Sequence, residues 1–128
     1  MKPLDLVRQL YDAFGRRDWP EVRAVLAPDV EWTQNEGFPD GGRHVGADAV
    51  IDGVFVRFRD NCQHWQAVVE EWLEAGDVII ALGEYRGVHR VTGRSVVAAF
   101  AHVYEVRDNR IIRFRQYTDT ALIRGAVA

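Results

Sequence analysis

The first half of the chain repeats apolar residues at intervals of three and four positions, which is the spacing of one helix face. This spacing predicts a first helix that ends at Gly15 and a later helix of about Ala47 to Arg59. Between them, Asp18 offers an N-cap acceptor for a short second helix that runs to Pro28. The N-terminal half is therefore expected to supply helices with one apolar face each.

A brief strand, Val30 to Gln34, separates the second and third helices, and the loop Asn35 to Gly46 follows it. That loop contains four glycines and one proline, a composition that allows it to arch over a cavity mouth. After the third helix the apolar period changes to two, which is typical of strands. The predicted strands are Trp65 to Glu74, Val78 to Arg86, Arg94 to Val106 and Arg110 to Thr118.

Short connections make these four strands antiparallel neighbours, so helices on one face of a curved sheet give an α+β fold. Hydrophobic residues make up 48% of the 128 residues and charged residues 27%, a balance typical of one globular domain over residues 1–128. The net charge of -3, with scattered basic residues, argues against a nucleic-acid partner. No apolar run has the length of a membrane span, and Cys62 is the only cysteine, so a cytoplasmic location is expected.

Two central strands carry apolar residues on both faces, and this pattern bears on oligomeric state. One set of residues can line a cavity, but the other set would then meet water. We therefore predict a homodimer through the outer face of the sheet. The alternative is that C-terminal residues such as Leu122, Ile123 and Val127 cover this patch within one chain.

The order and spacing of several motifs resemble the nuclear transport factor 2-like superfamily, especially its SnoaL-like and ketosteroid isomerase-related branches. The matching segments run from Tyr11-x-x-Phe14 through Leu26-Ala27-Pro28-Asp29-Val30-Glu31-Trp32 to Phe114-Arg115-Gln116-Tyr117-Thr118-Asp119. The resemblance implies a cone-shaped, curved antiparallel sheet wrapped around N-terminal helices, a cystatin-like α+β barrel whose interior holds the ligand. It implies activities that range from isomerases, cyclases and dehydratases to pure binding proteins.

His102 is the first candidate site residue, because it interrupts a strand that is otherwise apolar. A histidine in a cavity can exchange protons near neutral pH, although a hydrogen-bonded core histidine is an equal alternative. Asp119 ends the last strand and could pair with His102 or act as a base itself. Its alternative role is to cap a short C-terminal helical turn through Arg124.

Aromatic and amide side chains complete the candidate site. Tyr85 could donate its hydroxyl hydrogen to a carbonyl or an oxyanion, and Tyr11 is a further possible donor. Apolar walls and orienting amides are expected from Trp32, Phe100, Gln34 and Gln116. The alternative for the aromatic residues is an ordinary place in the core, and the glutamines could face solvent.

At two places this chain lacks the catalytic carboxylates of enzymes that it resembles, so the mechanisms of those enzymes do not carry over directly. Where the resemblance to ketosteroid isomerase calls for an aspartate base, this chain has Thr33 and Gln34, with Glu36 two residues on. Where limonene epoxide hydrolase carries its two carboxylates, this chain has Tyr85 and Gln116. The histidines show no metal-ligand spacing, so neither a metal nor another cofactor is expected.

Two functions follow from these expectations. The first is a cofactor-independent isomerase, cyclase or dehydratase that shuttles a proton on a small apolar substrate in the cavity. The second is a non-catalytic protein that binds a small apolar metabolite.

Overall fold

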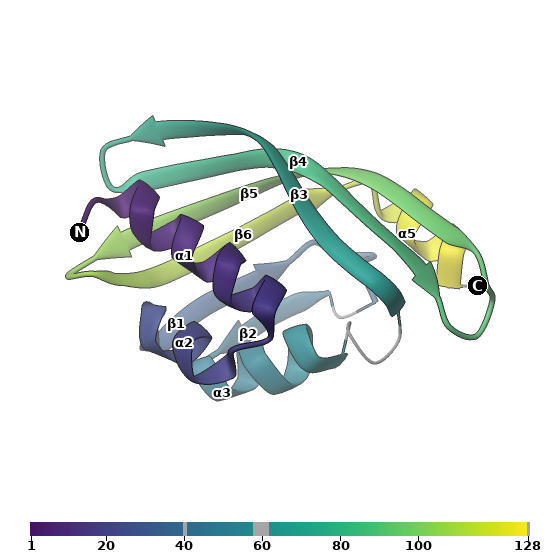
Figure 1. Ribbon diagram of the computed structural model, residues 1–128, viewed down its shortest axis with the longest axis horizontal. Helices are drawn as coiled ribbons and strands as arrows, with labels where there is room; N and C mark the ends of the chain where they lie inside the picture. Colours follow the sequence, from purple (N-terminus) through teal and green to yellow (C-terminus); the bar gives the residue numbers. More distant parts are fainter. Residues whose placement is uncertain (40, 58–61, 128) are drawn as a thin grey trace.

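The computed structural model describes residues 1–39, 41–57 and 62–127, and its main feature is a curved six-stranded sheet (Figure 1). The strand order is β2-β1-β6-β5-β4-β3. The elements are α1 (Pro3–Arg16), α2 (Trp19–Val25), β1 (Leu26–Gln34), β2 (Gly42–Val45), α3 (Ala47–Val50), η1 (Ile51–Phe55), β3 (Cys62–Ala75), β4 (Val78–His89), β5 (Ser95–Arg107), β6 (Arg110–Thr118) and α5 (Thr120–Val127).

The first two helices form where the sequence predicts them, with small shifts at their ends. α1 ends one residue later than expected, because Arg17 takes the left-handed conformation and its N–H bonds to the Phe14 carbonyl at 3.0 Å. Asp18 caps α2 as predicted and accepts a hydrogen bond from the Glu21 N–H at 3.2 Å. α2 stops at Val25 rather than Pro28, because Leu26 is already extended and begins β1.

The loop predicted at Asn35 to Gly46 is wrong in part, because Gly42–Val45 forms β2. This strand pairs antiparallel with the end of β1, from Glu31 opposite Val45 to Gln34 opposite Gly42. Its four residues do not alternate between apolar and polar, so no period marks them as a strand. Residue 40 of that loop lies outside the described residues.

The third predicted helix is two consecutive helices. α3 covers one turn, and η1 continues it as a π-helix that buries Ile51, Val54 and Phe55. The apolar spacing thus located the buried face but did not reveal the wider turn, which is rare in proteins. The predicted end at Arg59 lies outside the described residues.

The antiparallel meander from β3 to β6 is confirmed, with strand ends within three residues of those predicted. β1 joins the meander through β6, to which it pairs in parallel. The sheet is curved but not closed, because β2 and β3 form its two edges. The cone-shaped α+β fold is therefore present as an open sheet and not as a complete barrel.

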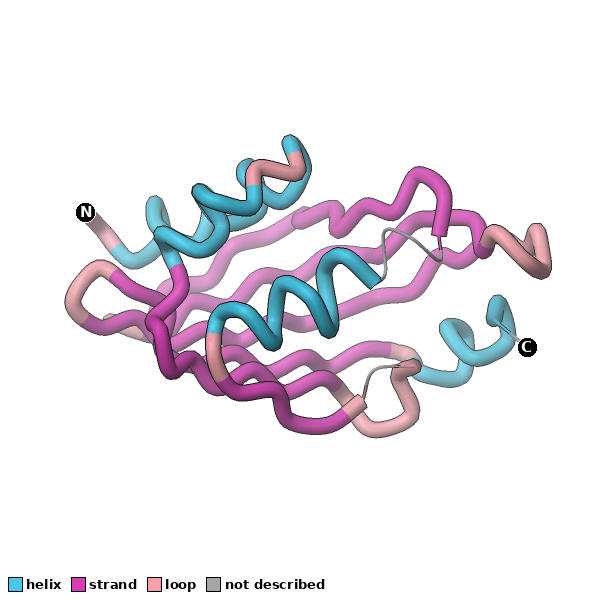
Figure 2. Tube along the Cα trace, turned by 90° about the horizontal axis from the view of Figure 1, so that it is seen from below, coloured by secondary structure: helices cyan, strands magenta, loops and turns pink. Residues whose placement is uncertain are grey.

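Helices α1, α2 and α3 lie across one face of this sheet, and α5 covers its far end (Figure 2). Side chains between the layers form two buried clusters. One cluster joins the first three helices to β1, β5 and β6, and the other joins α5 to β4 and β5. No helix in the described part of the chain is long and apolar enough to cross a membrane.

The outer face of the sheet keeps apolar residues that no described helix covers. Val97 on β5 is 55% exposed and Tyr117 on β6 is 50% exposed. Ile123 of α5 is buried on the inner side with Phe100 and Phe38, and Leu122 is 51% exposed. The C-terminal helix therefore does not cover the outer patch, while the side chain of Val127 lies outside the described part.

Candidate functional site

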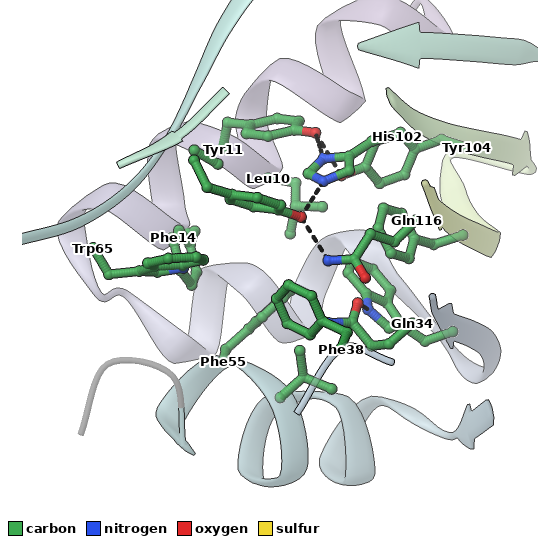
Figure 3. A pocket seen from close by; sticks show the side chains of 15 residues that line it. Leu10, Tyr11, Phe14, Gln34, Phe38, Phe55, Trp65, His102, Tyr104 and Gln116 are labelled. Atoms are coloured by element: carbon green, nitrogen blue, oxygen red, sulfur yellow. Dashed lines mark hydrogen bonds between the residues drawn. The ribbon is translucent and has the colours of Figure 1, made fainter. Parts of the chain in front are cut away.

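A cavity of about 60 Å³ lies between the helices and the inner face of the sheet, where the two buried clusters meet (Figure 3). In the part of the chain that the structure describes, fifteen side chains line it, and none of these is an aspartate, glutamate, lysine or arginine. The lining residues are Leu10, Tyr11, Phe14, Trp32, Gln34, Phe38, Val54, Phe55, Trp65, Ala67, Tyr85, His102, Tyr104, Phe114 and Gln116.

Strand alternation places the polar groups of this cavity. His102 and Tyr104 lie two residues apart on β5, so both point to the inner face. Gln116 of β6 is the direct cross-strand partner of His102, and Tyr85 of β4 points to the same face. Tyr11 reaches the same point from α1, so four elements contribute to one polar group.

His102 lies between two phenol groups, one at each ring nitrogen. Its Nδ1 is 2.5 Å from the Tyr11 hydroxyl, and its Nε2 is hydrogen-bonded to the Tyr85 hydroxyl. Tyr104 donates its hydroxyl hydrogen to Tyr11 at 2.8 Å, and Gln116 donates from Nε2 to Tyr85 at 2.7 Å. We call Tyr104, Tyr11, His102 and Tyr85 the tyrosine–histidine chain.

Gln116 is held in one orientation by the backbone. Its Oε1 accepts a hydrogen bond from the Asn35 N–H at 3.0 Å, so the amide nitrogen must face Tyr85. Asn35 is itself fixed, because its side-chain oxygen accepts from the Thr118 N–H at 3.0 Å. One end of the tyrosine–histidine chain is thus anchored to the ends of β1 and β6.

Burial keeps every member of the tyrosine–histidine chain uncharged at neutral pH. The imidazolium form of His102 would lie in an apolar enclosure, which lowers its pKa to about 3. Burial likewise raises the pKa of Tyr85, Tyr11 and Tyr104 above the ordinary value for a phenol. His102 is therefore a neutral imidazole with one N–H and one acceptor nitrogen.

The tyrosine–histidine chain carries one donor hydrogen more than its internal hydrogen bonds use. Three phenols and one neutral imidazole carry four hydrogens, but only three hydrogen bonds join them to one another. The fourth bond, from Gln116, uses a hydrogen of its own. One O–H is therefore left over, on Tyr85 if His102 carries its hydrogen on Nε2 and on Tyr11 if the hydrogen is on Nδ1.

The rest of the cavity wall is aromatic. Trp32 stacks on Phe114 with ring centroids 3.8 Å apart, and Trp65 stacks on Tyr85 at 4.9 Å. The indole N–H of Trp32 donates to Gln34 Oε1 at 3.0 Å, so that oxygen is already engaged. The walls offer apolar contact, and hydrogen-bond donors come from the spare O–H of the tyrosine–histidine chain and from the side-chain NH2 groups of Gln34 and Gln116.

The structure brings six of the eight predicted site residues to the cavity: Tyr11, Trp32, Gln34, Tyr85, His102 and Gln116. Phe100 is not in the lining, and its ring stacks on His102 with centroids 3.8 Å apart. Asp119 is exposed and caps α5, accepting a hydrogen bond from the Leu122 N–H at 3.1 Å. The expected pairing of Asp119 with His102 is not formed, because both imidazole nitrogens bond to tyrosines.

Sequence reasoning missed several lining residues, of which Tyr104 matters most. A period of two from His102 along β5 would have found it. Phe38 and Trp65 had no such signal, because one lies in a loop and the other at a break in strand register. No group of three or more metal-ligating side chains occurs among the described residues.

Sequence comparison matches residues 7–114 to the SnoaL-like domain. No curated protein matches the chain in sequence. Among solved structures, a nuclear transport factor 2-like protein of Burkholderia thailandensis E264 is 34% identical, with a TM-score of 0.95 and coverage of 100% of this chain and 98% of that one.

Two further structures are similar to this chain. A protein of unknown function from Burkholderia pseudomallei K96243 is 37% identical over 98% of each chain, with a TM-score of 0.86. IdmH, described as a putative polyketide cyclase from Streptomyces antibioticus, is 21% identical over 99% of each chain, with a TM-score of 0.83, and shows likeness of fold alone. The family match and the two Burkholderia structures agree: the chain belongs to the SnoaL-like family of the nuclear transport factor 2-like superfamily.

Proposed function

We propose that this protein binds a small, largely apolar molecule in the cavity and holds it by one oxygen atom. The spare O–H of the tyrosine–histidine chain carries this proposal. Since a buried donor without a partner costs free energy, the cavity favours a ligand that supplies an acceptor. A ketone, enone or quinone oxygen meets that need.

The cavity lining favours an uncharged ligand group beside the tyrosine–histidine chain. No charged side chain among the described residues lines the cavity, so a carboxylate inside it would lose its hydration without gaining a counter-ion. Trp32, Phe55 and Phe114 present flat apolar surfaces to the ligand. The expected ligand therefore has an unsaturated or cyclic apolar part with an oxygen directed at Tyr85 or Tyr11.

A catalytic version of this function is a cofactor-independent isomerase, cyclase or dehydratase. Donation of a tyrosine hydrogen to a ligand carbonyl stabilises negative charge that develops on its oxygen. When Tyr85 gives its hydrogen to the ligand oxygen, the Nε2 hydrogen of His102 would replace it while Nδ1 takes the hydrogen of Tyr11, and the negative charge would then lie on the phenol oxygen of Tyr11, to which Tyr104 donates. The putative cyclase role of the similar protein IdmH supports this version.

The non-catalytic version has support of its own. Among the described residues, the cavity lining offers no carboxylate base, and the low pKa of His102 makes it a weak one. Binding of an acceptor-bearing ligand is therefore the function that the geometry supports best. Catalysis adds to binding only if the tyrosine–histidine chain can move a proton on the bound molecule.

Both versions are tested with 2-cyclohexen-1-one, compared with 1-methylcyclohexene as an apolar molecule without an acceptor. Calorimetric titration is expected to show binding of the enone that weakens about fivefold to tenfold in Tyr85→Phe. Tyr117→Phe is the matched control, because Tyr117 lies on the outer face of the sheet and does not line the cavity. Equal affinity for the two molecules would contradict the proposal.

Hydrogen exchange separates the two versions. If the protein catalyses enolisation, the NMR signals of the carbon-bound hydrogens beside the carbonyl disappear faster in D₂O with protein than without. Binding without faster exchange identifies the non-catalytic protein. Circular dichroism at the same temperature shows that Tyr85→Phe is still folded.

We also propose a homodimer, formed through the outer apolar face of the sheet in a cytoplasmic protein. Val97, Ala99 and Tyr117 are exposed there, and Ile80 pairs with Val103 on the same face. Burying such a patch against a second copy removes its contact with water. Sedimentation equilibrium is expected to give twice the 14.6 kDa chain mass, and Val103→Asp is expected to give monomers. A wild-type monomer at micromolar concentration would refute the dimer.

A further inference from the structure

A second hollow, of about 470 Å³, opens between the end of α1 and the beginning of β3. Four residues line both this hollow and the cavity: Tyr11, Phe14, Trp65 and Ala67. Figure 3 shows Trp65 and Phe14 on the opposite side of the cavity from Gln116. The hollow therefore meets the cavity at the end away from the anchored amide, and we call it the outer hollow.

The volume of the cavity limits how much of a ligand it can hold. The cavity measures about 60 Å³, whereas pockets for ligands of drug size measure roughly 300–1,000 Å³. A small ring fills the cavity, and a longer ligand must extend past Trp65 and Phe14. Its remaining part would then lie in the outer hollow.

The backbone beside the outer hollow is unusual at His64. Among the described residues, four non-glycine residues have positive φ, and two of these, Arg17 at 59° and His64 at 55°, line the outer hollow. At Arg17 this conformation is the C-cap of α1 described above, whereas His64 lies where β3 loses register with β4, between Gln63 and Gln66. A strained residue at such a break costs free energy and is common beside functional sites.

The break in register lies beside Trp65. The Trp65 ring stacks on Tyr85 and lies over Gly87 of the neighbouring strand. A Cβ atom at Gly87 would lie only 2.9 Å from the Trp65 ring, so a larger residue there would require the ring to shift. Trp65 is thus part of the wall that the two spaces share, and His64 lines the outer hollow.

Charge distinguishes the outer hollow from the cavity. Arg16 pairs with Asp12 and lies 3.8 Å from Asp18, but Arg17 makes no ion pair or side-chain hydrogen bond with any described residue. The α1 carbonyls nearest to Arg17 already accept backbone hydrogen bonds from residues 17 and 18, which reduces their repulsion of an anion. A cation without a counter-ion is therefore exposed at the rim of the outer hollow.

We propose that the outer hollow binds the carboxylate end of an elongated ligand, with Arg17 as its counter-ion and His64 as a second hydrogen-bonding partner. The apolar, carbonyl-bearing end of the same ligand lies in the cavity, so this inference rests on the proposed function. The ligand class is an amphipathic keto acid. Its charge stays in the solvent-accessible hollow, and its ketone oxygen reaches the spare tyrosine hydrogen.

The test compares 4-oxo-4-phenylbutanoate with its methyl ester, which has the same ring and ketone but no charge. Tryptophan fluorescence titration is expected to show that the acid binds about threefold to fivefold tighter than the ester. Arg17→Gln is expected to remove this preference, and Arg17→Lys to restore most of it. Arg16→Gln is the matched control, because it removes an adjacent arginine that is already paired.

The outcomes separate this inference from the proposed function. Equal binding of acid and ester to the wild-type protein, with both weakened by Tyr85→Phe, would refute the outer site and leave the cavity proposal standing. Failure of both molecules to bind would contradict both proposals. A preference for the acid that survives Arg17→Gln, or that does not shrink between 50 and about 500 mM salt, would overturn the role of Arg17.

Discussion

Burial of the neutral imidazole of His102 makes the stability of this protein dependent on pH. The folded pKa is about 3, against 6.5 for an ordinary histidine. Between these values the unfolded chain binds a proton at this position and the folded chain does not. The stabilising contribution is therefore complete above pH 6.5 and is lost as the pH falls toward 3.

The size of this effect follows from the two pKa values. Each pH unit inside the window changes the free energy of unfolding by about 1.4 kcal/mol. Between pH 7.5 and 5.0 the expected loss is about 2 kcal/mol, since only the part below pH 6.5 contributes fully. That loss is a sizeable fraction of the roughly 5–15 kcal/mol that stabilises a typical domain.

Urea unfolding followed by tryptophan fluorescence, repeated from pH 7.5 to 5.0, measures this slope. His102→Gln is expected to be less stable at every pH but to lose about 2 kcal/mol less over the same interval. His64→Gln is the control, because His64 is exposed and its replacement leaves the buried network unchanged. Equal slopes for the wild type and His102→Gln would show that a neutral buried imidazole is not what links folding to pH.

Two further substitutions test the assignment of single residues. Trp32→Ala is expected to lower the free energy of unfolding by about 3–5 kcal/mol in urea titrations, because the Trp32 ring is buried against Phe114. A loss below about 1 kcal/mol would mean that the ring packs loosely. Asp119→Ala is expected to cost about 1 kcal/mol through the lost α5 cap, with unchanged enone affinity by calorimetry. A tenfold loss of enone affinity would instead indicate that Asp119 belongs to the binding site.

The sequence predicted the meander well because its strands are local neighbours joined by short turns. The alternation of β5 placed His102 on the same face as Phe100, but both faces of this strand are apolar, so the period alone did not say which one is the inner face. Contacts between distant segments had no comparable signal. The parallel pairing of β1 with β6 and the small strand β2 depend on how the sheet curves, which no local period encodes.

The predicted pair of His102 and Asp119 is absent from the observed site for a similar reason. The sequence favoured a pair of His102 and Asp119, because Asp119 directly follows the last strand and was the carboxylate best placed to reach the cavity. In the structure Asp119 instead caps α5, where it accepts a hydrogen bond from an N–H three residues further on. His102 bonds to the phenols of Tyr11 and Tyr85. Tyr11 comes from α1, so its approach to His102 could be known only once the helix had been placed over the sheet.

The parallel pairing of β1 with β6 has a consequence for the order in which the chain folds. Trp32 leaves the ribosome long before Phe114, the ring on which it stacks, has been synthesised. Until then β1 has only the short strand β2 beside it in the sheet, and the helices α1 to α3 have only part of a surface to cover. We expect the meander, whose contacts are local, to form first and the N-terminal third to dock on it afterwards. The cavity then comes into being only in the last step of folding, when Tyr11 arrives on α1 and meets His102.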